Sequence, residues 1–269
     1  CGGIWLALGL PWRIRVMALP CLLPALWWTP ARPAQGVVEL LAIDVGQGQA
    51  VLVRTAQHSL LYDAGPQYSA DSDAGERVVV PLLKAMGERL DMLVLSHRDA
   101  DHTGGAHAVL AEQAQARLMA SVEGHHRLWQ GRPVNPCMAG HSWSWDGVRF
   151  EVLHPSEEAA LQLVSGSADM SMPKSNAMSC VLRIIDAHGV TALLVGDIEQ
   201  AQERELLARD ALQSVSYLLV PHHGSKTSSS AAFLDALGPQ VAVVQSGYRN
   251  RFGHPAPEVV QRYSDRQIP

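Results

Sequence analysis

The sequence contains few cysteines, no internal repeat and, in its first 36 residues, no acidic residue at all. Four cysteines in 269 residues are too few for a disulfide-rich scaffold, and Cys137 and Cys180 lie too far apart in the sequence to predict a bridge. The composition, 47% hydrophobic and 17% charged with 22 Gly and 16 Pro, excludes a disordered or collagen-like chain. The length suits one large globular domain or two small ones.

The missing acidic residues divide the chain into two parts of different charge. Residues 1–36 carry only Arg13, Arg15 and Arg32, which leaves 18 of the 21 basic residues and all 26 acidic residues in the remainder, a net charge of −8. An acidic surface of this kind is unfavourable for binding nucleic acid, because phosphate groups require positive charge. Residues 37–269 are therefore expected to bind DNA weakly.

The apolar start of the chain is too short for an ordinary membrane-spanning helix. Val16 to Trp28 is 13 residues long, whereas a complete span needs ~20. A secretory signal peptide would be indicated by an initiator Met and a small-residue cleavage pattern, and the sequence shows neither. The pair Trp27 and Trp28 is typical of a membrane interface, and Arg13 and Arg15 would mark the cytoplasmic side. We predict a membrane-segment fragment over residues 1–30 and a linker over 31–36, with a buried helical hairpin as the alternative.

Apolar runs and helical periodicity alternate from residue 37 onwards. Short strands are predicted over residues 37–45, 50–54, 58–63, 91–96, 149–153, 179–185, 190–196, 217–221 and 240–246. Helices are predicted over residues 78–86, 106–116, 199–212, 228–237 and 257–263. Several strands follow one another directly, which favours sheets layered with helices, an α/β (α+β) class, over a strict βαβ repeat.

Side chains that bind metals follow the apolar run 91–96. His97, Asp99, Asp101 and His102 lie within six residues, and glycines follow them. So many ionisable groups at one strand end are costly unless a cation lies among them. Imidazole and carboxylate ligands suit zinc or manganese.

Other strand ends carry the same kinds of side chain. Asp197 follows the run 190–196, and His222 and His223 follow the run 217–221. A single aspartate at such a position is often a helix cap, and a histidine pair alone could be a turn. Neighbouring strand ends converge on one edge of a sheet, so these side chains are expected to share one pocket with the first group. Asp44 and Asp63 also follow strands.

These residues resemble the signature of the metallo-β-lactamase superfamily, His-x-[His/Asp]-x-Asp-His. More narrowly, the chain is similar to the carboxyl-terminal lactamase-like domain of ComEC-type DNA-uptake (competence) channel proteins. The similarity extends from Val37 to Tyr263 and rests on AIDVGQGQAVLV, YDAGP, DMLVLSHRDADHTGG, SNAMSCVLRI, LLVGDIE, VPHHGSKTS and NRFGHPAPEVV. It implies an αββα sandwich over residues 37–269, preceded by membrane helices, and a further strand pair beyond the last helix, so that the carboxyl-terminal strands are expected to be truncated here.

The resemblance implies a centre for one or two divalent ions, Zn²⁺ or Mn²⁺. The ligands it implies are His97, Asp99 and Asp197 for one ion, and Asp101, His102, Asp197 and His222 for the other, with Asp197 bridging. It also implies a third histidine before Asp197, where this chain has Asn176 and Ser179 in the matching stretch. We therefore expect a single ion or a loosely held pair.

The activity implied by the resemblance is metal-dependent hydrolysis of a phosphodiester. A nuclease of the DNA-uptake machinery would degrade the single strand that is not imported, with the domain on the extracytoplasmic side of the bacterial inner membrane. Asp101 would orient the attacking water, and His223, Lys226 and His254 would contact phosphate or protonate the leaving group. Arg98, Lys174, Arg249 and Arg251 offer local positive charge near the motifs.

Two other functions are compatible with the same residues. A small-molecule or lipid hydrolase could use the same scaffold, because a fold does not determine its substrate. A non-catalytic domain that holds DNA at the mouth of the channel is the third hypothesis, and the missing histidine favours it. Four further histidines, His125, His126, His141 and His154, are interpreted as surface or core residues, and Trp143, Trp145 and Phe150 as strand packing.

Overall fold

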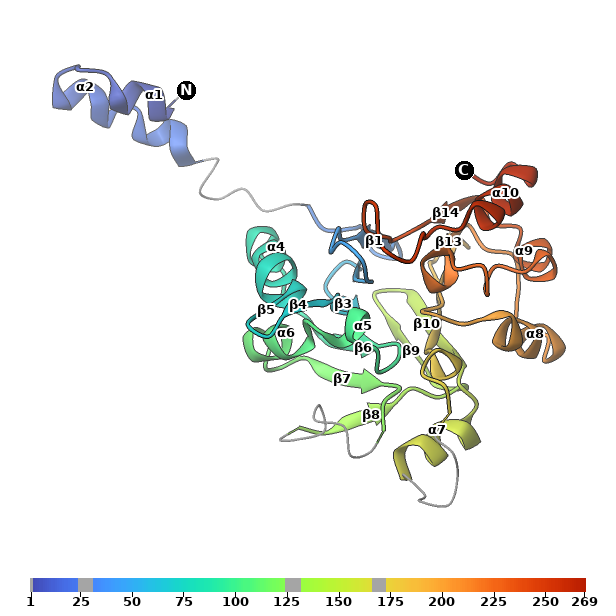
Figure 1. Cartoon of the computed structure of the whole chain (residues 1–269). Coiled ribbons are helices and arrows are strands. Elements are labelled where there is room, and N and C mark those ends of the chain that lie inside the picture. The colour runs from blue at the N-terminus through green and yellow to red at the C-terminus, as the bar shows by residue number, and fades with distance from the viewer. Residues whose placement is uncertain (1, 24–30, 124–131, 166–172) are drawn as a thin grey trace.

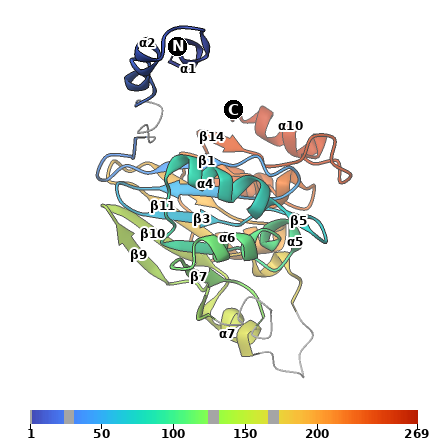
Figure 2. The ribbon, with the colours of Figure 1, turned by 90° about the vertical axis from the view of Figure 1, so that its left-hand side faces the viewer.

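The computed structural model describes residues 2–23, 31–123, 132–165 and 173–269. Two six-stranded sheets pack face to face, and helices cover the outer face of each sheet, so that the layers follow the order αββα (Figure 1). The predicted fold class is confirmed. In Figure 2, which is turned by 90° from Figure 1, the helices of the first layer lie in front of the strands that they cover.

The first sheet has the strand order β1-β2-β3-β6-β7-β8. Neighbours from β1 to β3 pair antiparallel, whereas β3, β6, β7 and β8 pair parallel. The apolar runs predict the first four strands, but the sequences of β7 and β8, RLMA and VNP, contain no such run. The bounds are β1 (Glu39–Ala42), β2 (Val51–Arg54), β3 (Ser59–Tyr62), β6 (Met92–Leu95), β7 (Arg117–Ala120) and β8 (Val134–Pro136).

The second sheet has the strand order β14-β13-β12-β11-β10-β9. The ladder from β9 to β12 is antiparallel, and β12, β13 and β14 are parallel. All of these strands except β9 are predicted from the sequence. The bounds are β9 (Ser142–Trp145), β10 (Val148–His154), β11 (Val181–Ile185), β12 (Thr191–Leu194), β13 (Tyr217–Leu219) and β14 (Val241–Val243).

Helices flank the two sheets on their outer faces (Figure 1). The first sheet is covered by α4 (Val80–Met86), which continues the π-helical turn η2 (Gly75–Val79), and by α6 (Ala106–Glu112), which follows the short α5 (Ala100–Thr103). The second sheet is covered by α8 (Gln200–Ala208), α9 (Ala231–Leu237) and α10 (Pro257–Asp265). The remaining elements are the hairpin β4 (Gln67–Ser69) and β5 (Ser72–Asp73), α7 (Glu157–Ser165), η4 (Asn176–Met178) and η5 (Pro221–Gly224).

Local sequence explains where these helices begin and end. The Ser230 side chain accepts a hydrogen bond from the backbone N–H of Phe233 at the start of α9, which caps the helix. Gly238 ends the same helix with φ +47°, and Gly87 ends α4 with φ +66°. This left-handed conformation is easily adopted only by glycine, and it terminates a helix.

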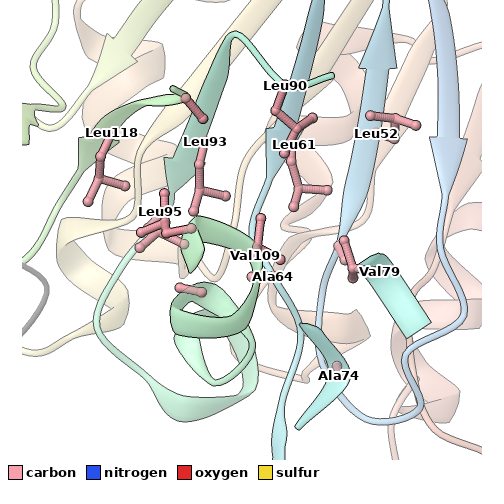
Figure 3. Close-up of a cluster of buried hydrophobic side chains, with 14 of the residues drawn as sticks. Leu52, Leu61, Ala64, Ala74, Val79, Leu90, Leu93, Leu95, Val109 and Leu118 are labelled. Atoms are coloured by element: carbon pink, nitrogen blue, oxygen red, sulfur yellow. The ribbon is translucent and has the colours of Figure 1, made fainter. Parts of the chain in front are cut away.

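Three layers of apolar side chains hold the sandwich together. Along β2, Leu52 packs under the helices of the first layer while Val51 and Val53 pack between the two sheets, as the two-residue period of a strand requires. Figure 3 shows the outer layer, in which Leu61 and Leu93 on the strands lie near Val109 of α6. A third cluster lies between the second sheet and its helices. Trp143, Trp145 and Phe150 pack in the layer between the sheets, as their interpretation as strand packing requires.

A disulfide bond that the cysteine spacing does not predict joins the two sheets. Cys137 follows β8 in the first sheet and Cys180 precedes β11 in the second, and their Cα atoms lie 5.9 Å apart. Their separation of 43 positions along the sequence conceals this proximity. Packing of the two sheets brings the strand ends together, and this contact could not be predicted from the spacing alone.

The beginning of the chain forms short helical segments, α1 (Gly2–Ala7), α2 (Trp12–Val16) and η1 (Leu19–Leu22). Within the described ranges, none of the helices has the length and apolar character needed to cross a membrane. Trp27 and Trp28, part of the predicted membrane segment, lie outside the described residues, as do His125 and His126. In the predicted linker, Arg32 forms an ion pair with Glu88 at 2.6 Å.

Candidate metal centre

Four strands of the two sheets end at the same edge of the sandwich, and each is followed by a polar side chain of the centre. Asp63 follows β3 and His97 comes two residues after β6 in the first sheet, while Asp197 follows β12 and His223 follows β13 in the second. None of these four is an edge strand, and the side chains that follow them are buried. The predicted convergence of strand ends is therefore present in the structure.

Three imidazole rings and two carboxylates surround one small region. The Nε2 atom of His102 lies 3.2 Å from Oδ1 of Asp197, and the Nε2 atoms of His97 and His223 lie 3.9 and 3.6 Å from its Oδ2. His223 Nε2 also lies 3.4 Å from Oδ2 of Asp101. Two groups of three side chains each have their ligand atoms within 4.8 Å of one another. The first group is His97, His102 and Asp197, and the second is Asp101, His102 and His223.

The polar atoms at the middle of this region have no hydrogen-bond partner among the described residues. They are the Nε2 atoms of His97, His102 and His223 and Oδ1 of Asp197, all of them buried. Buried polar groups without partners are costly, and nearly all such groups in proteins are satisfied. Imidazole nitrogens and carboxylate oxygens that converge in this way suit a divalent cation, so the residues present fit a metal centre.

Each of these histidines is held from behind through its Nδ1 atom. The Nδ1 of His102 lies 2.8 Å from Oδ2 of Asp63, and that of His223 lies 2.8 Å from the carbonyl oxygen of Gln245. Ser96 Oγ donates to Asp63 and lies 2.9 Å from Nδ1 of His97. Because these acceptors require the proton on Nδ1, the lone pair of Nε2 is left facing the centre, as in metal-binding histidines.

The electrostatics of the centre are those of a site that attracts positive charge. Burial would raise the pKa of Asp197, but His102 and His223 outweigh it and hold the pKa well below its ordinary value. Burial would lower the pKa of His102, but Asp197 and Asp63 outweigh it and raise that pKa well above its ordinary value. A proton on His102 therefore occupies the position that a cation would take, and the two compete.

Comparisons with known proteins place the chain in a family. The model of the metallo-β-lactamase superfamily matches residues 43–247. The chain belongs to the metallo-β-lactamase superfamily. It is 37% identical over 254 residues to the competence protein ComA of Neisseria gonorrhoeae, which covers 94% of this chain and 32% of that protein. It is 35% identical over 221 residues to recombination protein 2 of Haemophilus influenzae, covering 82% of this chain and 26% of that protein.

The chain thus spans between about a quarter and a third of the length of these curated relatives. Among solved structures, the metallo-β-lactamase-fold protein YhfI of Bacillus subtilis superimposes with a TM-score of 0.53 at 13% identity, covering 84% of this chain and 92% of that one. This similarity shows the fold. In this chain, the candidate metal centre lies at one edge of the αββα sandwich.

The two neighbouring histidines of the metallo-β-lactamase centre differ in their position. His223, whose side chain is 2% exposed, points into the region shared with Asp101, whereas His222 is 20% exposed. His222 Nε2 lies 3.7 Å from Oδ2 of Asp197 and 3.4 Å from the side-chain nitrogen of Asn176. Both residues have positive φ angles, 50° and 54°, so this turn directs two consecutive rings towards the same carboxylate.

The other predicted site residues lie at different distances from the centre. Asp99 lies 3.5 Å from Nε2 of His97. Ser179 accepts a hydrogen bond from the backbone N–H of Asp197 and lies 3.4 Å from Nδ1 of His97, so it positions two candidate ligands. The ring of His254 lies 5.7 Å from that of His222. Lys226 is exposed, and its side chain forms no hydrogen bond or ion pair with the part of the chain described.

Several polar residues that support the metallo-β-lactamase centre carry no signal in the sequence. Gln49 donates to Asp63, and Gln245 accepts from His223 through its backbone. A single glutamine within an apolar run has no distinctive spacing, and a backbone acceptor has no residue-type preference. Ser96 could be suspected only because it directly precedes His97.

Proposed function

We propose that this domain is a metal-dependent phosphodiesterase, a nuclease of a bacterial DNA-uptake (natural transformation) channel protein that degrades the DNA strand that is not imported. The observation that carries the proposal is that the Nε2 atoms of His97, His102 and His223, which have no hydrogen-bond partner among the described residues, converge on Asp197. Relatives named as a competence protein and a recombination protein support the biological setting.

The proposed ligands form two sets around the shared carboxylate of Asp197. One set is His97, Asp99, Asp197 and His222, and the other is Asp101, His102, Asp197 and His223. His222 takes the place of the third histidine, and His223 takes the role given to His222 by resemblance. One or two Zn²⁺ or Mn²⁺ ions bound there would supply a Lewis acid that polarises a phosphodiester oxygen and acidifies water.

Asp101 is the residue of the centre best placed to orient the attacking water. Burial would raise its pKa, but the hydrogen bond with His223 and the charge of His102 lower the pKa to about 2, so the carboxylate is ionised at neutral pH. Its side chain is 33% exposed and lines a cavity of about 540 Å³ at the surface, which would admit a substrate.

His254 lies beside the centre in a position suited to the leaving group. Its Nδ1 atom is buried and has no hydrogen-bond partner within the described ranges. Burial and the neighbouring His222 and His223 lower its pKa, so the neutral ring is favoured and would have to take up a proton before it could protonate the leaving group. Lys226 is proposed only to attract the phosphate backbone, because its side chain is exposed.

The proposed location is the extracytoplasmic side of the inner membrane. Disulfide bonds persist in oxidising compartments and are rare in the cytosol, and the bond between Cys137 and Cys180 supports this side. Attachment to the membrane through residues 1–30 and contact with the competence machinery remain part of the proposal.

A cleavage assay tests the proposal. The chain is loaded with Mn²⁺ or Zn²⁺, its metal content is measured, and labelled single-stranded and double-stranded DNA are supplied. We expect cleavage of single strands, and a loss of roughly 100-fold or more in the Asp101→Asn variant. Asp210→Asn, an exposed aspartate after α8, is the matched control and should cleave normally.

The alternatives give different results in the same assay. A folded, metal-loaded chain that cleaves no DNA would falsify the nuclease assignment. Turnover of a generic ester or lactone in place of DNA would indicate a small-molecule or lipid hydrolase. DNA binding without any turnover would indicate a domain that only holds DNA at the channel mouth.

A further inference from the structure

The loop of residues 247–253 exposes aromatic and positively charged side chains together. Tyr248 is 89% exposed and Phe252 is 53% exposed. The guanidinium group of Arg249 lies 5.3 Å from the centre of the Tyr248 ring, and that of Arg251 lies 4.8 Å from the Phe252 ring. Neither arginine has an acidic partner among the residues that the structure describes. The loop therefore presents two flat apolar surfaces, each next to an uncompensated positive charge.

The conformation of this loop is fixed by its own hydrogen bonds. Asn250 Oδ1 accepts from the backbone N–H groups of Phe252 and His254, and Asn250 Nδ2 donates to the carbonyl oxygen of Gly247. Gly247 N–H donates to Oε1 of Gln47, and a Cβ at Gly247 would lie 2.8 Å from the Gln47 nitrogen. The exposed side chains thus sit on an ordered support, which reduces the entropy lost when a ligand binds.

The same loop forms one wall of the cavity that opens beside the candidate metal centre. This cavity of about 540 Å³ is lined by Arg251 and Phe252 from the loop and by Asp101 from the centre, together with Gln47, Gln67 and Tyr68. The Phe252 ring stacks on that of His254 at 5.7 Å, and the His254 ring lies 5.7 Å from that of His222. A continuous path of rings leads from the exposed loop to the centre.

We propose that residues 247–253 are a binding platform for single-stranded DNA, with bases stacked on Tyr248 and Phe252 and phosphates bound by Arg249 and Arg251. Stacking on aromatic rings is available to every base and therefore independent of sequence, and arginines beside the rings bind the backbone. A base in a duplex has both faces covered, so the platform selects single strands. This inference rests on the proposed nuclease function, since it names how the same site holds its substrate.

The platform also explains how a domain with a negative net charge could bind DNA. Residues 37–269 carry a net charge of −8, so the surface as a whole does not attract DNA. Stacking contributes affinity without depending on net charge, and the two arginines concentrate positive charge beside the cavity. Affinity for DNA is therefore expected to depend on the loop far more than on any other part of the surface.

Binding is measured with the full chain in the presence of a chelator, so that cleavage does not interfere. The probes are a labelled 15-residue oligothymidylate and a labelled abasic oligonucleotide of equal length, which keeps the phosphates and lacks the bases. We expect Tyr248→Ala and Phe252→Ala each to weaken binding of the oligothymidylate about 5-fold or more and to leave binding of the abasic probe unchanged. Phe252→Tyr should retain affinity, and Tyr217→Ala, an exposed tyrosine on β13, is the matched control.

Removing the arginines should affect both probes. Arg249→Gln and Arg251→Gln each should weaken binding of both, and each should reduce the salt dependence of binding by about 0.7 in the logarithmic slope. Equal binding of the oligothymidylate by the wild type and the aromatic variants overturns the platform, as does a wild type that binds neither probe. If binding follows the prediction but no DNA is cleaved in Mn²⁺, the platform is supported and the nuclease function is rejected. If DNA is cleaved but the aromatic variants bind normally, the nuclease function is supported and the platform is rejected.

Discussion

The Nδ1 atom of His102 lies 2.8 Å from Oδ2 of Asp63, and both side chains are completely buried. This carboxylate fixes the ring of His102 so that Nε2 faces the centre, and it increases the basicity of that nitrogen. We predict that Asp63→Asn lowers the affinity for Zn²⁺ or Mn²⁺ about 10- to 100-fold, because such outer partners of metal-binding histidines contribute to that extent. Titration with a metal-sensitive dye measures the change.

Asp44→Asn provides the control for this variant. Asp44 also follows a strand, but it is exposed, and among the described residues its carboxylate accepts only from the nearby backbone N–H of Gly46. Its replacement should leave metal affinity unchanged. Asparagine tolerates the positive φ of 60° at Asp63, so a loss of metal binding there reflects the lost carboxylate and not a strained backbone. Equal affinity of the two variants would contradict the positioning role of Asp63.

The two neighbouring histidines should contribute unequally to metal binding. His223 is buried, holds Nε2 towards Asp101 and Asp197, and is fixed by the carbonyl oxygen of Gln245. His222 is more exposed, and its Nε2 atom lies 3.7 Å from Oδ2 of Asp197. We predict that His223→Ala reduces the affinity for the first equivalent of metal at least about 10-fold more than His222→Ala does. Isothermal titration would refute the prediction if the order were reversed.

Much of this fold could be predicted because its strands are buried on both faces. Such strands are continuous apolar runs, and the segments 58–63 and 91–96 have this form, so β3 and β6 were predictable. The strands β7 and β8 contain charged or polar residues and a proline, so local pattern does not identify them. Their position depends on the pairing of β7 with β6 and of β8 with β7, which is a property of the assembled sheet.

The candidate centre was predictable in composition but not in detail. The spacing of the residues from His97 to His102 indicates a metal site, and the strand ends indicate Asp197 as its partner. Spacing cannot decide which of two consecutive histidines faces inwards, because that depends on the positive φ angles of the turn. Contacts through backbone atoms or between distant loops, such as those of Gln245 and the Cys137–Cys180 bond, are likewise set by tertiary packing.

The disulfide bond should contribute substantially to stability. It closes a segment of 43 residues, and both cysteines are buried between the sheets. Restriction of the unfolded chain by a loop of this length is worth about 4 kcal/mol. We predict that the double variant Cys137→Ala/Cys180→Ala lowers the free energy of unfolding in urea by about this amount. The wild type unfolded in the presence of a reductant should show a similar loss, and a change below about 1 kcal/mol in both experiments would contradict the prediction.

Asp146 should make stability depend on pH in a narrow acidic range. Its Oδ2 accepts from Oγ1 of Thr55 at 2.6 Å and from the backbone N–H of Gln57 at 2.7 Å, and it lies 3.1 Å from Nδ1 of His58. Burial would raise the pKa of Asp146, but the hydrogen bonds with Thr55, His58 and Gln57 lower the pKa to about 2. These contacts join the β9–β10 turn of the second sheet to the β2–β3 turn of the first.

As the pH falls, the unfolded chain, with an ordinary pKa of 3.8, binds this proton before the folded chain does. The stabilisation by Asp146 is therefore complete above about pH 4 and disappears as the pH falls through 2. We predict that Asp146→Asn costs about 1.5 kcal/mol at pH 6, and that the difference from the wild type vanishes near pH 2. Asp210→Asn is the matched control, because Asp210 is exposed and also has a positive φ, of 50°. Urea unfolding between pH 2 and 7 measures both, and a difference for Asp146→Asn that stays constant over this range would show that the carboxylate charge is not what stabilises the contact.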